Sequence, residues 1–175
     1  NLKFYPPALL AAARANKAAA PILKLPVTLL NGKAKKLAAC SAWELLNLPI
    51  DVVLGLPALV QKVTGIDAQQ LSAFMGPHTV SALGTAGACS QYIVERGLKQ
   101  LPVLTAPVTN HYSWPKAAAL LGLGTNQLWS VQVDLDARQE VDLAGKLRKN
   151  TETLRARLQH ALDTKTPVMT VVTVL

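Results

Sequence analysis

The second half of this chain alternates between helix-like and strand-like segments, and this alternation constrains the fold more than any other feature. Apolar or alternating stretches with the composition of strands occupy residues 101–108, 128–133 and 167–175. Helical periodicity covers residues 84–97, 113–121 and 142–162. Strands joined by single helices form mostly parallel sheets with right-handed crossovers. The sequence therefore predicts an α/β fold with helices flanking a mostly parallel sheet.

For two of these segments the sequence also predicts which residues are buried. Residues 167–175 are apolar or β-branched throughout, which is typical of a strand buried on both faces. On the last helix we expect a buried stripe of leucines, namely Leu143, Leu147, Leu154, Leu158 and Leu162. Because a buried strand needs a neighbour or a covering helix, we expect an incomplete domain that belongs to a larger protein or to an assembly of two polypeptides.

The first half has mainly helical patterns. We expect helices over residues 7–20, 34–48 and 56–63. Pro49 would end the second of these helices, and Pro57 would lie in the first turn of the third. Prolines predict an extended or irregular path over residues 22–30. We therefore divide the chain into a helical N-terminal segment, residues 1–80, which would serve dimer or domain packing, and a partial α/β domain, residues 81–175.

The charge pattern limits the kinds of partner. The formal net charge is +8, and residues 1–50 hold seven lysines and arginines against one acid, Glu44. These cations are spread at loose helical spacing and match no nucleic-acid-binding motif, so a solvated helix face or a basic lip over an anionic ligand is favoured. No run approaches the roughly 20 apolar residues of a membrane span, and no stretch has the order of a secretory signal. We expect no nucleic acid, no membrane and no metal as partners.

Two cysteines, Cys40 and Cys89, lie far apart in the sequence and show no metal-binding or redox spacing. We expect two reduced and buried thiols. Reduced thiols favour a reducing compartment, so we expect a cytoplasmic protein.

Two motifs stand where α/β proteins bind ligands, beyond strand ends and at helix starts. Residues 83–87, Leu-Gly-Thr-Ala-Gly, open a helix with a flexible backbone and one hydroxyl, which suits a phosphate group. A small-residue helix start that serves only close packing is the commoner alternative. His111 follows the strand at 101–108 and begins the block His-Tyr-Ser-Trp-Pro-Lys, residues 111–116. A ring at a strand end suits a flat anionic cofactor, although a capping histidine is the commoner alternative for His111 alone.

Together and in this order, these motifs resemble the group II pyridoxal-phosphate-dependent decarboxylases, which include the glutamate, tyrosine and aromatic amino-acid decarboxylases. When the arginine that closes the family's first motif is aligned with Arg96, the family's Gly-Thr pair falls on Gly84 and Thr85. The family's His-x-Ser-x-x-Lys-Ala motif is met by His111, Ser113, Lys116 and Ala117. Its Leu-Gly-Leu-Gly and Val-x-Val-Asp motifs are matched by residues 121–124 and 131–134. The resemblance covers residues 80–175.

The resemblance implies a fold-type-I fold of the kind that pyridoxal-phosphate-dependent transferases share. It implies decarboxylation of an L-amino acid with pyridoxal 5′-phosphate as cofactor, in a homodimer or with a complementary chain that completes the site. His111 would be the catalytic residue and would stack on the pyridine ring. Gly84, Thr85 and the N–H of Ala86 would bind the phosphate at the positive end of their helix. Ser113 would be a supporting residue of the cofactor site.

The chain departs from the family pattern at several places. Leu83 and Ala88 stand where the family has glycine and asparagine. The aspartate that pairs with the pyridine nitrogen and the lysine that forms the Schiff base would both lie beyond residue 175, so we expect this chain to lack the turnover step by itself. Lys116 follows a proline in a helix start and is interpreted as a surface lysine. Tyr112 and Trp114 are interpreted as packing aromatics.

Three other hypotheses stay open. A non-catalytic relative or subunit would keep the fold and serve as an interaction or regulatory protein, and the departures at Leu83 and Ala88 favour it slightly. A related fold-type-I enzyme, such as an aminotransferase or a cysteine desulfurase, fits the block at residues 111–116 less well. A basic module built on residues 1–50, binding a membrane surface or a nucleic acid, is the weakest alternative.

Overall fold

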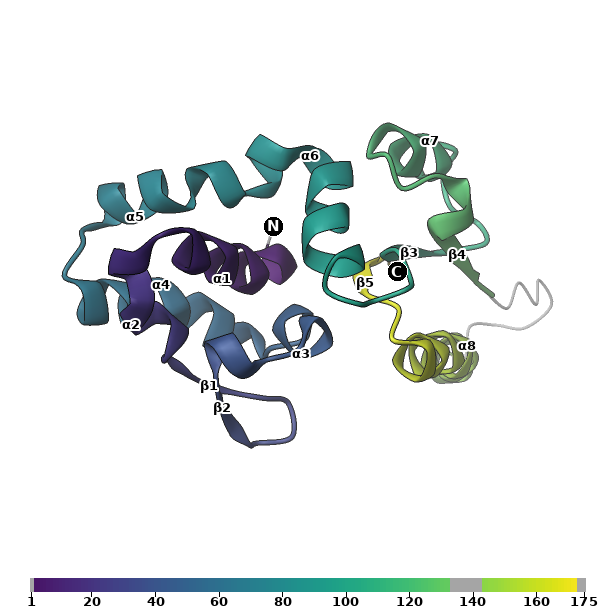
Figure 1. The fold of residues 1–175 in the computed structure, drawn as a ribbon. Helices are drawn as coiled ribbons and strands as arrows, with labels where there is room; N and C mark the ends of the chain where they lie inside the picture. Colours follow the sequence, from purple (N-terminus) through teal and green to yellow (C-terminus); the bar gives the residue numbers. More distant parts are fainter. Residues whose placement is uncertain (1, 133–142, 173–175) are drawn as a thin grey trace. The chain divides into compact units, whose positions relative to one another are not determined.

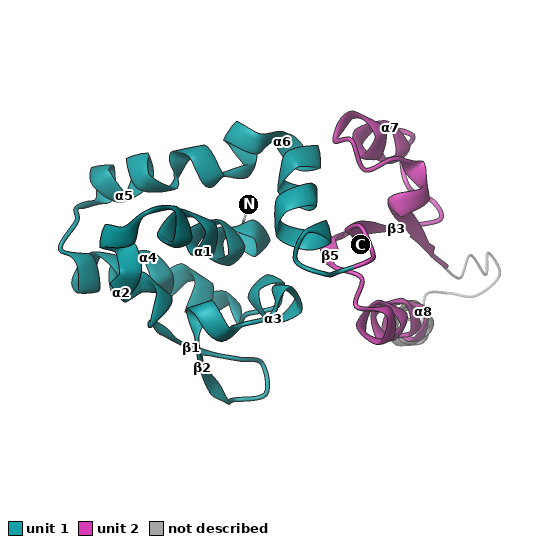
Figure 2. Cartoon of the chain, in the orientation of Figure 1, with its two compact units in different colours: residues 1–98 teal, residues 99–175 magenta. Residues whose placement is uncertain are grey.

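The computed structural model describes residues 2–132 and 143–172, with side chains of the last helix described from residue 152. The chain forms two compact units, residues 1–98 and 99–175 (Figure 2). The first unit includes the helix at Val80–Cys89, which the sequence assigns to the second domain.

The first unit is a helical assembly around α1, Tyr5–Ala15 (Figure 1). The other helices are α2 (Ala20–Leu23), α3 (Ala42–Leu46), α4 (Ile50–Thr64), α5 (Ala68–Met75) and α6 (Val80–Cys89), with a π-helical turn at Ser90–Val94. Helix α1 contacts α2, α3, α4 and α5. Its Leu9 and Leu10 are fully buried, so the Ala- and Leu-rich sequence of α1 forms the core of this unit.

Helix α1 ends earlier than the predicted helix over residues 7–20. Asn16 has extended backbone angles, and its side chain accepts a hydrogen bond from the N–H of Ala18 at 3.0 Å. Asparagine favours this arrangement because its side chain replaces a helical hydrogen bond locally. A short 3-10 turn and α2 then follow, and Pro21 lies in the first turn of α2. The predicted extended path is therefore limited to β1, Pro26–Thr28.

The predicted helix over residues 34–48 is wrong in its first half. Residues Ala34–Lys36 form β2, which pairs antiparallel with β1 and places Val27 opposite Lys35. Gly32, with a φ of 78°, lies in the loop that joins the two strands. The helix begins only at Ala42, where Ser41 and Glu44 form a capping box. The pairing of this segment with β1 thus overrides its local helical pattern.

Helix α4 is longer than predicted and carries Pro57 in its interior. Interior proline costs a helix about 3 kcal/mol because it removes a hydrogen bond and crowds the preceding turn. Burial of Val53, Leu56 and Val60 against the rest of the unit offsets that cost. The helix ends at Gly65, whose φ of 73° gives the left-handed C-cap that glycine favours.

The second unit is a parallel three-stranded sheet with one helix on each side. The strands are β3 (Val103–Pro107), β4 (Leu128–Val131) and β5 (Val168–Val171), in the order β4-β3-β5. In Figure 1, helix α7 (Ser113–Leu120) lies above the strands and α8 (Leu143–Thr164) lies below them. All five residues of β3 are buried, which confirms the predicted core strand. The α/β architecture with a parallel sheet is also as predicted.

Strand β5 differs from its prediction. Val168 and Met169 are half-buried, and Thr170 and Val171 are exposed. Within the described residues β5 has one neighbour, β3, and lies at the edge of the sheet, so its apolar composition is not matched by burial here. Residues 173–175, and the predicted strand end at 133–134, lie outside the described residues.

The leucine stripe predicted for α8 is wrong at Leu158 and Leu162, whereas Leu154 is half-buried. Leu158 and Leu162 are 39% and 55% exposed, whereas Ala161 is 2% exposed. The helix instead contacts β4 through Arg157, whose Nε donates to the carbonyl of Ser130 at 3.2 Å, and through His160, whose ring lies 5.5 Å from that of Trp129. The side chains of Leu143 and Leu147 lie outside the described part of the helix.

Candidate functional site

The candidate site begins where β3 ends. Val108 continues the ladder, because its N–H donates to the carbonyl of Val131 at 2.9 Å. Asn110 then makes a tight turn by donating both its backbone N–H and its side-chain Nδ2 to the carbonyl of Pro107, at 2.9 and 2.7 Å. This turn brings His111 directly after the carboxyl end of the central strand and immediately before α7.

The strand order places His111 at a position that α/β proteins use for ligands. Chain connections from the central strand β3 and from its neighbour β4 lead to helices on opposite sides of the sheet (Figure 1). In open α/β sheets, ligands bind beyond the carboxyl ends of neighbouring strands whose connections diverge in this way. The prediction that His111 follows the buried strand is confirmed.

His111 is held at one of its two ring nitrogens. The backbone N–H of Ser113 lies 3.3 Å from the His111 Nδ1, and the Ser113 Oγ lies 3.0 Å from the same nitrogen. A backbone N–H can only donate, so Nδ1 is the acceptor and the neutral ring carries its proton on Nε2. The ring itself is exposed. Among the described residues Nε2 has no hydrogen-bond partner, so His111 presents this nitrogen and an accessible ring.

The neighbouring aromatic residue covers one side of this histidine. The ring centroids of His111 and Tyr112 are 4.1 Å apart, with planes tilted by 46°. The Lys116 Nζ lies 4.6 Å from the centroid of the Tyr112 ring, within cation–π range. Tyr112 is 65% exposed, so it is not a core residue, and the contacts of its ring are with His111 and Lys116. Lys116 is a surface lysine, as predicted.

The arrangement of Tyr112 and Lys116 could have been found from the sequence. Residues four apart on a helix are neighbours on its surface, and an aromatic ring with a lysine at this spacing is a common pair. Trp114 is half-buried and agrees better with a packing role.

Gly84, Thr85 and Ala86 lie in the first unit, where the backbone breaks out of helical geometry. Gly84 has a φ of 69° and a ψ of 170° inside α6, which begins at Val80 rather than at Gly84 as predicted. A Cβ at Gly84 would meet no atom within 4 Å, so glycine is required by the backbone conformation and not by lack of space. The helix resumes at Thr85, which is half-buried, and Ala86 is exposed.

The predicted site residues thus form two local groups. His111 and Ser113 are in direct contact within the second unit. Gly84, Thr85 and Ala86 are consecutive at the backbone break of the first unit. The two cysteines are free and buried, as predicted. Among the described residues, no helix combines the length and apolar character needed to cross a membrane.

Comparison with known proteins finds sequence similarity to L-tyrosine decarboxylases. No family model matches the chain. The chain is 31% identical over 127 residues to an L-tyrosine decarboxylase of Enterococcus faecalis, covering 72% of this chain and 17% of that protein. It is 27% identical over 152 residues to an L-tyrosine decarboxylase of Levilactobacillus brevis, covering 86% and 19%. An L-tyrosine decarboxylase of Enterococcus faecium is 23% identical over 154 residues, covering 88% and 20%.

The chain therefore spans about a fifth of the length of these curated relatives. The similarity supports the resemblance to amino-acid decarboxylases at the level of sequence. The parallel α/β unit is compatible with a segment of a larger cofactor-binding domain.

Proposed function

We propose that this chain is a segment of a pyridoxal-phosphate-dependent enzyme that decarboxylates an L-amino acid. The observation that carries the proposal is His111, an exposed ring at the carboxyl end of the central parallel strand, held at Nδ1 by Ser113. The similarity to three L-tyrosine decarboxylases supports the reaction class.

The residues around His111 fit a flat aromatic cofactor. Tyr112 covers one side of the imidazole, so a second ring can stack on the other side. Because Nδ1 is already engaged by Ser113, the ring orientation is set before a ligand arrives, which lowers the entropic cost of binding. Bound pyridoxal phosphate would supply an electron sink for the bond to the departing carboxyl group. His111 would orient the pyridine ring, and Ser113 would hold His111.

The phosphate is proposed to bind at Gly84, Thr85 and Ala86. The left-handed backbone of Gly84 interrupts α6, and the Thr85 hydroxyl lies at the point where the helix resumes. Hydroxyl and N–H groups at such a point are suited to a phosphate group. Homodimerisation or a complementary chain, an L-amino-acid substrate and a cytoplasmic location belong to the same proposal and follow from the resemblance.

An aldehyde-free analogue tests the ring-stacking role without covalent reaction at surface lysines. 4-Deoxypyridoxine 5′-phosphate would be titrated into the chain and its affinity measured by calorimetry. We expect H111A to weaken binding at least tenfold, which corresponds to about 1.4 kcal/mol. H160A is the matched control, because His160 is another exposed histidine of the second unit that also lies against an aromatic ring. Equal affinities for the wild type and H111A would reject the proposed role of His111.

The unphosphorylated analogue 4-deoxypyridoxine separates the ring from the phosphate. We expect H111A to weaken binding of both analogues, and Thr85→Val to weaken only the phosphorylated one. If Thr85→Val leaves the difference in affinity between the two analogues unchanged, Thr85 does not bind the phosphate. This conclusion holds whatever the result for H111A.

A further inference from the structure

Helix α4 buries one face within the first unit and leaves the rest of its surface apolar and exposed. Val53, Leu56 and Val60 form the buried face. Four large apolar side chains of the same helix are between 38% and 61% exposed, namely Ile50, Leu54, Leu59 and Val63. A surface helix ordinarily presents polar side chains to water, so an exposed apolar surface of this extent indicates a place where another polypeptide binds.

An open hollow of about 450 Å³ follows this exposed surface. Its lining residues on α4 extend from Asp51 to Lys62, and Pro26 and Thr28 of β1 form the other side. On α4, residues 51, 55, 58 and 62 recur at spacings of four, three and four, which places them in one row along the helix. The two central positions of this row, 55 and 58, are glycine and alanine, so a second helix can approach α4 closely there.

The pattern of residues on this surface is complementary to itself when a second copy of α4 runs antiparallel. A two-fold axis midway between Gly55 and Ala58 pairs residues that are equally distant from that midpoint in the sequence. The resulting pairs across the two copies are Ile50 with Val63, Leu54 with Leu59, Gly55 with Ala58, and Asp51 with Lys62. Large apolar residues thus meet large apolar residues, small residues meet at the crossing point, and opposite charges meet at both ends.

The charges of α4 favour the antiparallel orientation. Asp51, in the first turn, and Lys62, in the last turn, are the charged residues of this helix, and neither takes part in an ion pair among the described residues. An antiparallel copy places each carboxylate beside the ammonium group of the other chain and sets opposite ends of the two helix dipoles side by side. A parallel copy would instead bring like charges together at each end.

We propose that α4 is a self-association surface through which two copies of this chain pair antiparallel, with Asp51 of each copy beside Lys62 of the other. A single pair of helices buries less area than a standard interface, so we expect a dissociation constant in the micromolar rather than the nanomolar range. The proposal rests on α4 and not on the proposed function. It can therefore fail without affecting the outcome of the analogue-binding experiments at His111, and the reverse also holds.

Exchange of charges tests this pairing. Sedimentation velocity of the chain from about 1 to about 300 µM would cover the expected range of dissociation constants, and we expect a monomer–dimer equilibrium. Asp51→Lys and Lys62→Glu each bring like charges together at both ends of the helix pair, so each should weaken dimerisation at least tenfold. An equimolar mixture of these two variants should form a heterodimer, because every charge pair between them joins opposite signs.

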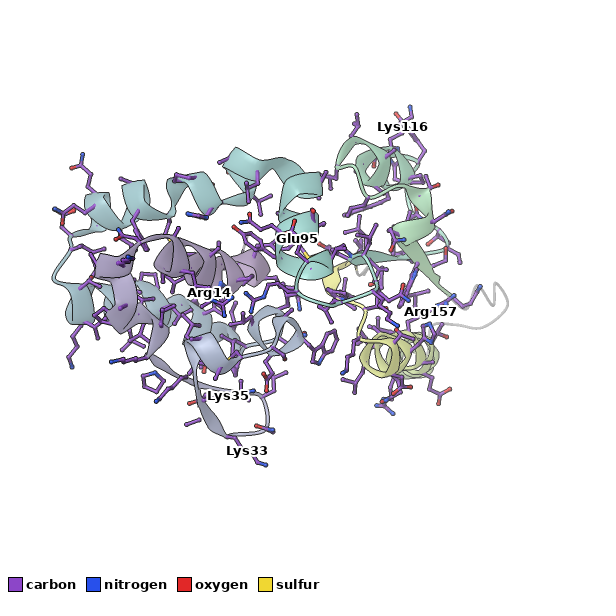
Figure 3. The ribbon with its side chains drawn as sticks, in the orientation of Figure 1. Arg14, Lys33, Lys35, Glu95, Lys116 and Arg157 are labelled. Carbon is purple, nitrogen blue, oxygen red and sulfur yellow. The ribbon has the colours of Figure 1, made fainter. Side chains whose placement is uncertain are left out.

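Two further variants separate the surface from general effects of charge. Lys33→Glu is the matched control and should leave the equilibrium unchanged, because Lys33 does not line the hollow and lies at the far end of the β1–β2 hairpin (Figure 3). Leu54→Gln, at the most exposed of the four apolar residues, should weaken the dimer without a change of charge. Circular dichroism checks that each variant keeps its helical content.

Three results would overturn the proposal. The first is a wild-type chain that stays monomeric over the whole concentration range. The second is a dimer that Asp51→Lys, Lys62→Glu and Leu54→Gln leave intact, because the contact would then lie on another surface. The third is a mixture of the two charge variants that associates no more strongly than either variant alone.

Discussion

The Nδ1 of His111 lies 3.0 Å from the Oγ of Ser113, and the backbone N–H of Ser113 approaches the same nitrogen at 3.3 Å. Both contacts come from the first residue of α7. The helix start thus determines the protonation pattern of the ring, because a backbone donor requires an unprotonated Nδ1. The open nitrogen of His111, Nε2, is left as a donor at the carboxyl end of β3.

This relationship predicts the tautomer of His111. At about pH 8.5, where histidine is ordinarily neutral, we expect long-range ¹H–¹⁵N spectra to show the proton of His111 on Nε2. Ser113→Ala removes one of the two hydrogen bonds, worth about 1 kcal/mol, so we expect greater mobility of the ring and the same tautomer. Ser113→Thr should restore the order. His78 and His160 serve as internal references, and a wild-type His111 with its proton on Nδ1 would contradict the assignment.

Substitution of glycine by alanine should have opposite effects on the free energy of unfolding at two positions. Gly55 lies inside α4 with helical backbone angles, and Gly84 lies inside α6 with a φ of 69°. A Cβ would meet no atom within 4 Å at either position, so the backbone alone decides. We expect Gly55→Ala to raise the free energy of unfolding by about 0.5–1 kcal/mol and Gly84→Ala to lower it by about 1–3 kcal/mol. Urea unfolding followed by circular dichroism measures both, and effects of the same sign would disprove the conformational argument.

Because Tyr92 is buried, we expect the folded chain to lose stability at alkaline pH. The Tyr92 hydroxyl donates to the carbonyl of His78 at 2.5 Å, and the Tyr92 side chain is 1% exposed. Burial raises the pKa of the Tyr92 phenol, so the unfolded chain loses this proton at a lower pH than the folded one. The contribution of the protonated Tyr92 phenol to stability is therefore complete below about pH 10, the pKa of tyrosine in an unfolded chain. It is lost as the pH rises through the pKa of Tyr92 in the folded chain.

Tyr92→Phe checks this prediction. We expect it to lower the free energy of unfolding by about 1 kcal/mol at neutral pH, through loss of the hydrogen bond. The difference from the wild type should shrink as the pH rises from about 9 to about 11. Tyr112→Phe, at a tyrosine that is 65% exposed, is the control. If the difference in the free energy of unfolding between Tyr92→Phe and the wild type stays constant with pH, the predicted dependence on the Tyr92 proton is contradicted.

Much of the second unit could be predicted from the sequence. The buried run at residues 101–108 contains β3, and the helix expected at 113–121 matches α7 within a residue. The glycine expected to stop a helix at Gly97 does have a left-handed φ of 85°. These features depend on contacts within a few residues, where periodicity and glycine placement are direct signals.

Other parts could not be predicted, because packing and pairing with other segments of the chain decide them. The pairing of Val27 with Lys35 forms a hairpin where the local pattern favours a helix. The exposure of Leu158 and Leu162 follows from how α8 contacts β4 through Arg157 and His160 rather than from its leucine spacing. The contact between Tyr112 and His111 depends on the path of the turn after β3.

Local spacing and backbone preference were enough to predict the alternation of helices and strands, the importance of the glycine at residue 84 and the place of the histidine block after the central strand. Long-range packing was needed to show that β5 has a single strand neighbour among the described residues. It was also needed to show that Arg96 is half-buried and that burial and the charge of Arg14 lower its pKa. Arg14 and Arg96 are separated by most of the first unit in sequence, and no local pattern relates them. The packing of the first unit decides how far Arg96 is buried and how strongly the charge of Arg14 acts on it. The pKa of Arg96 can therefore be interpreted only once that packing is known.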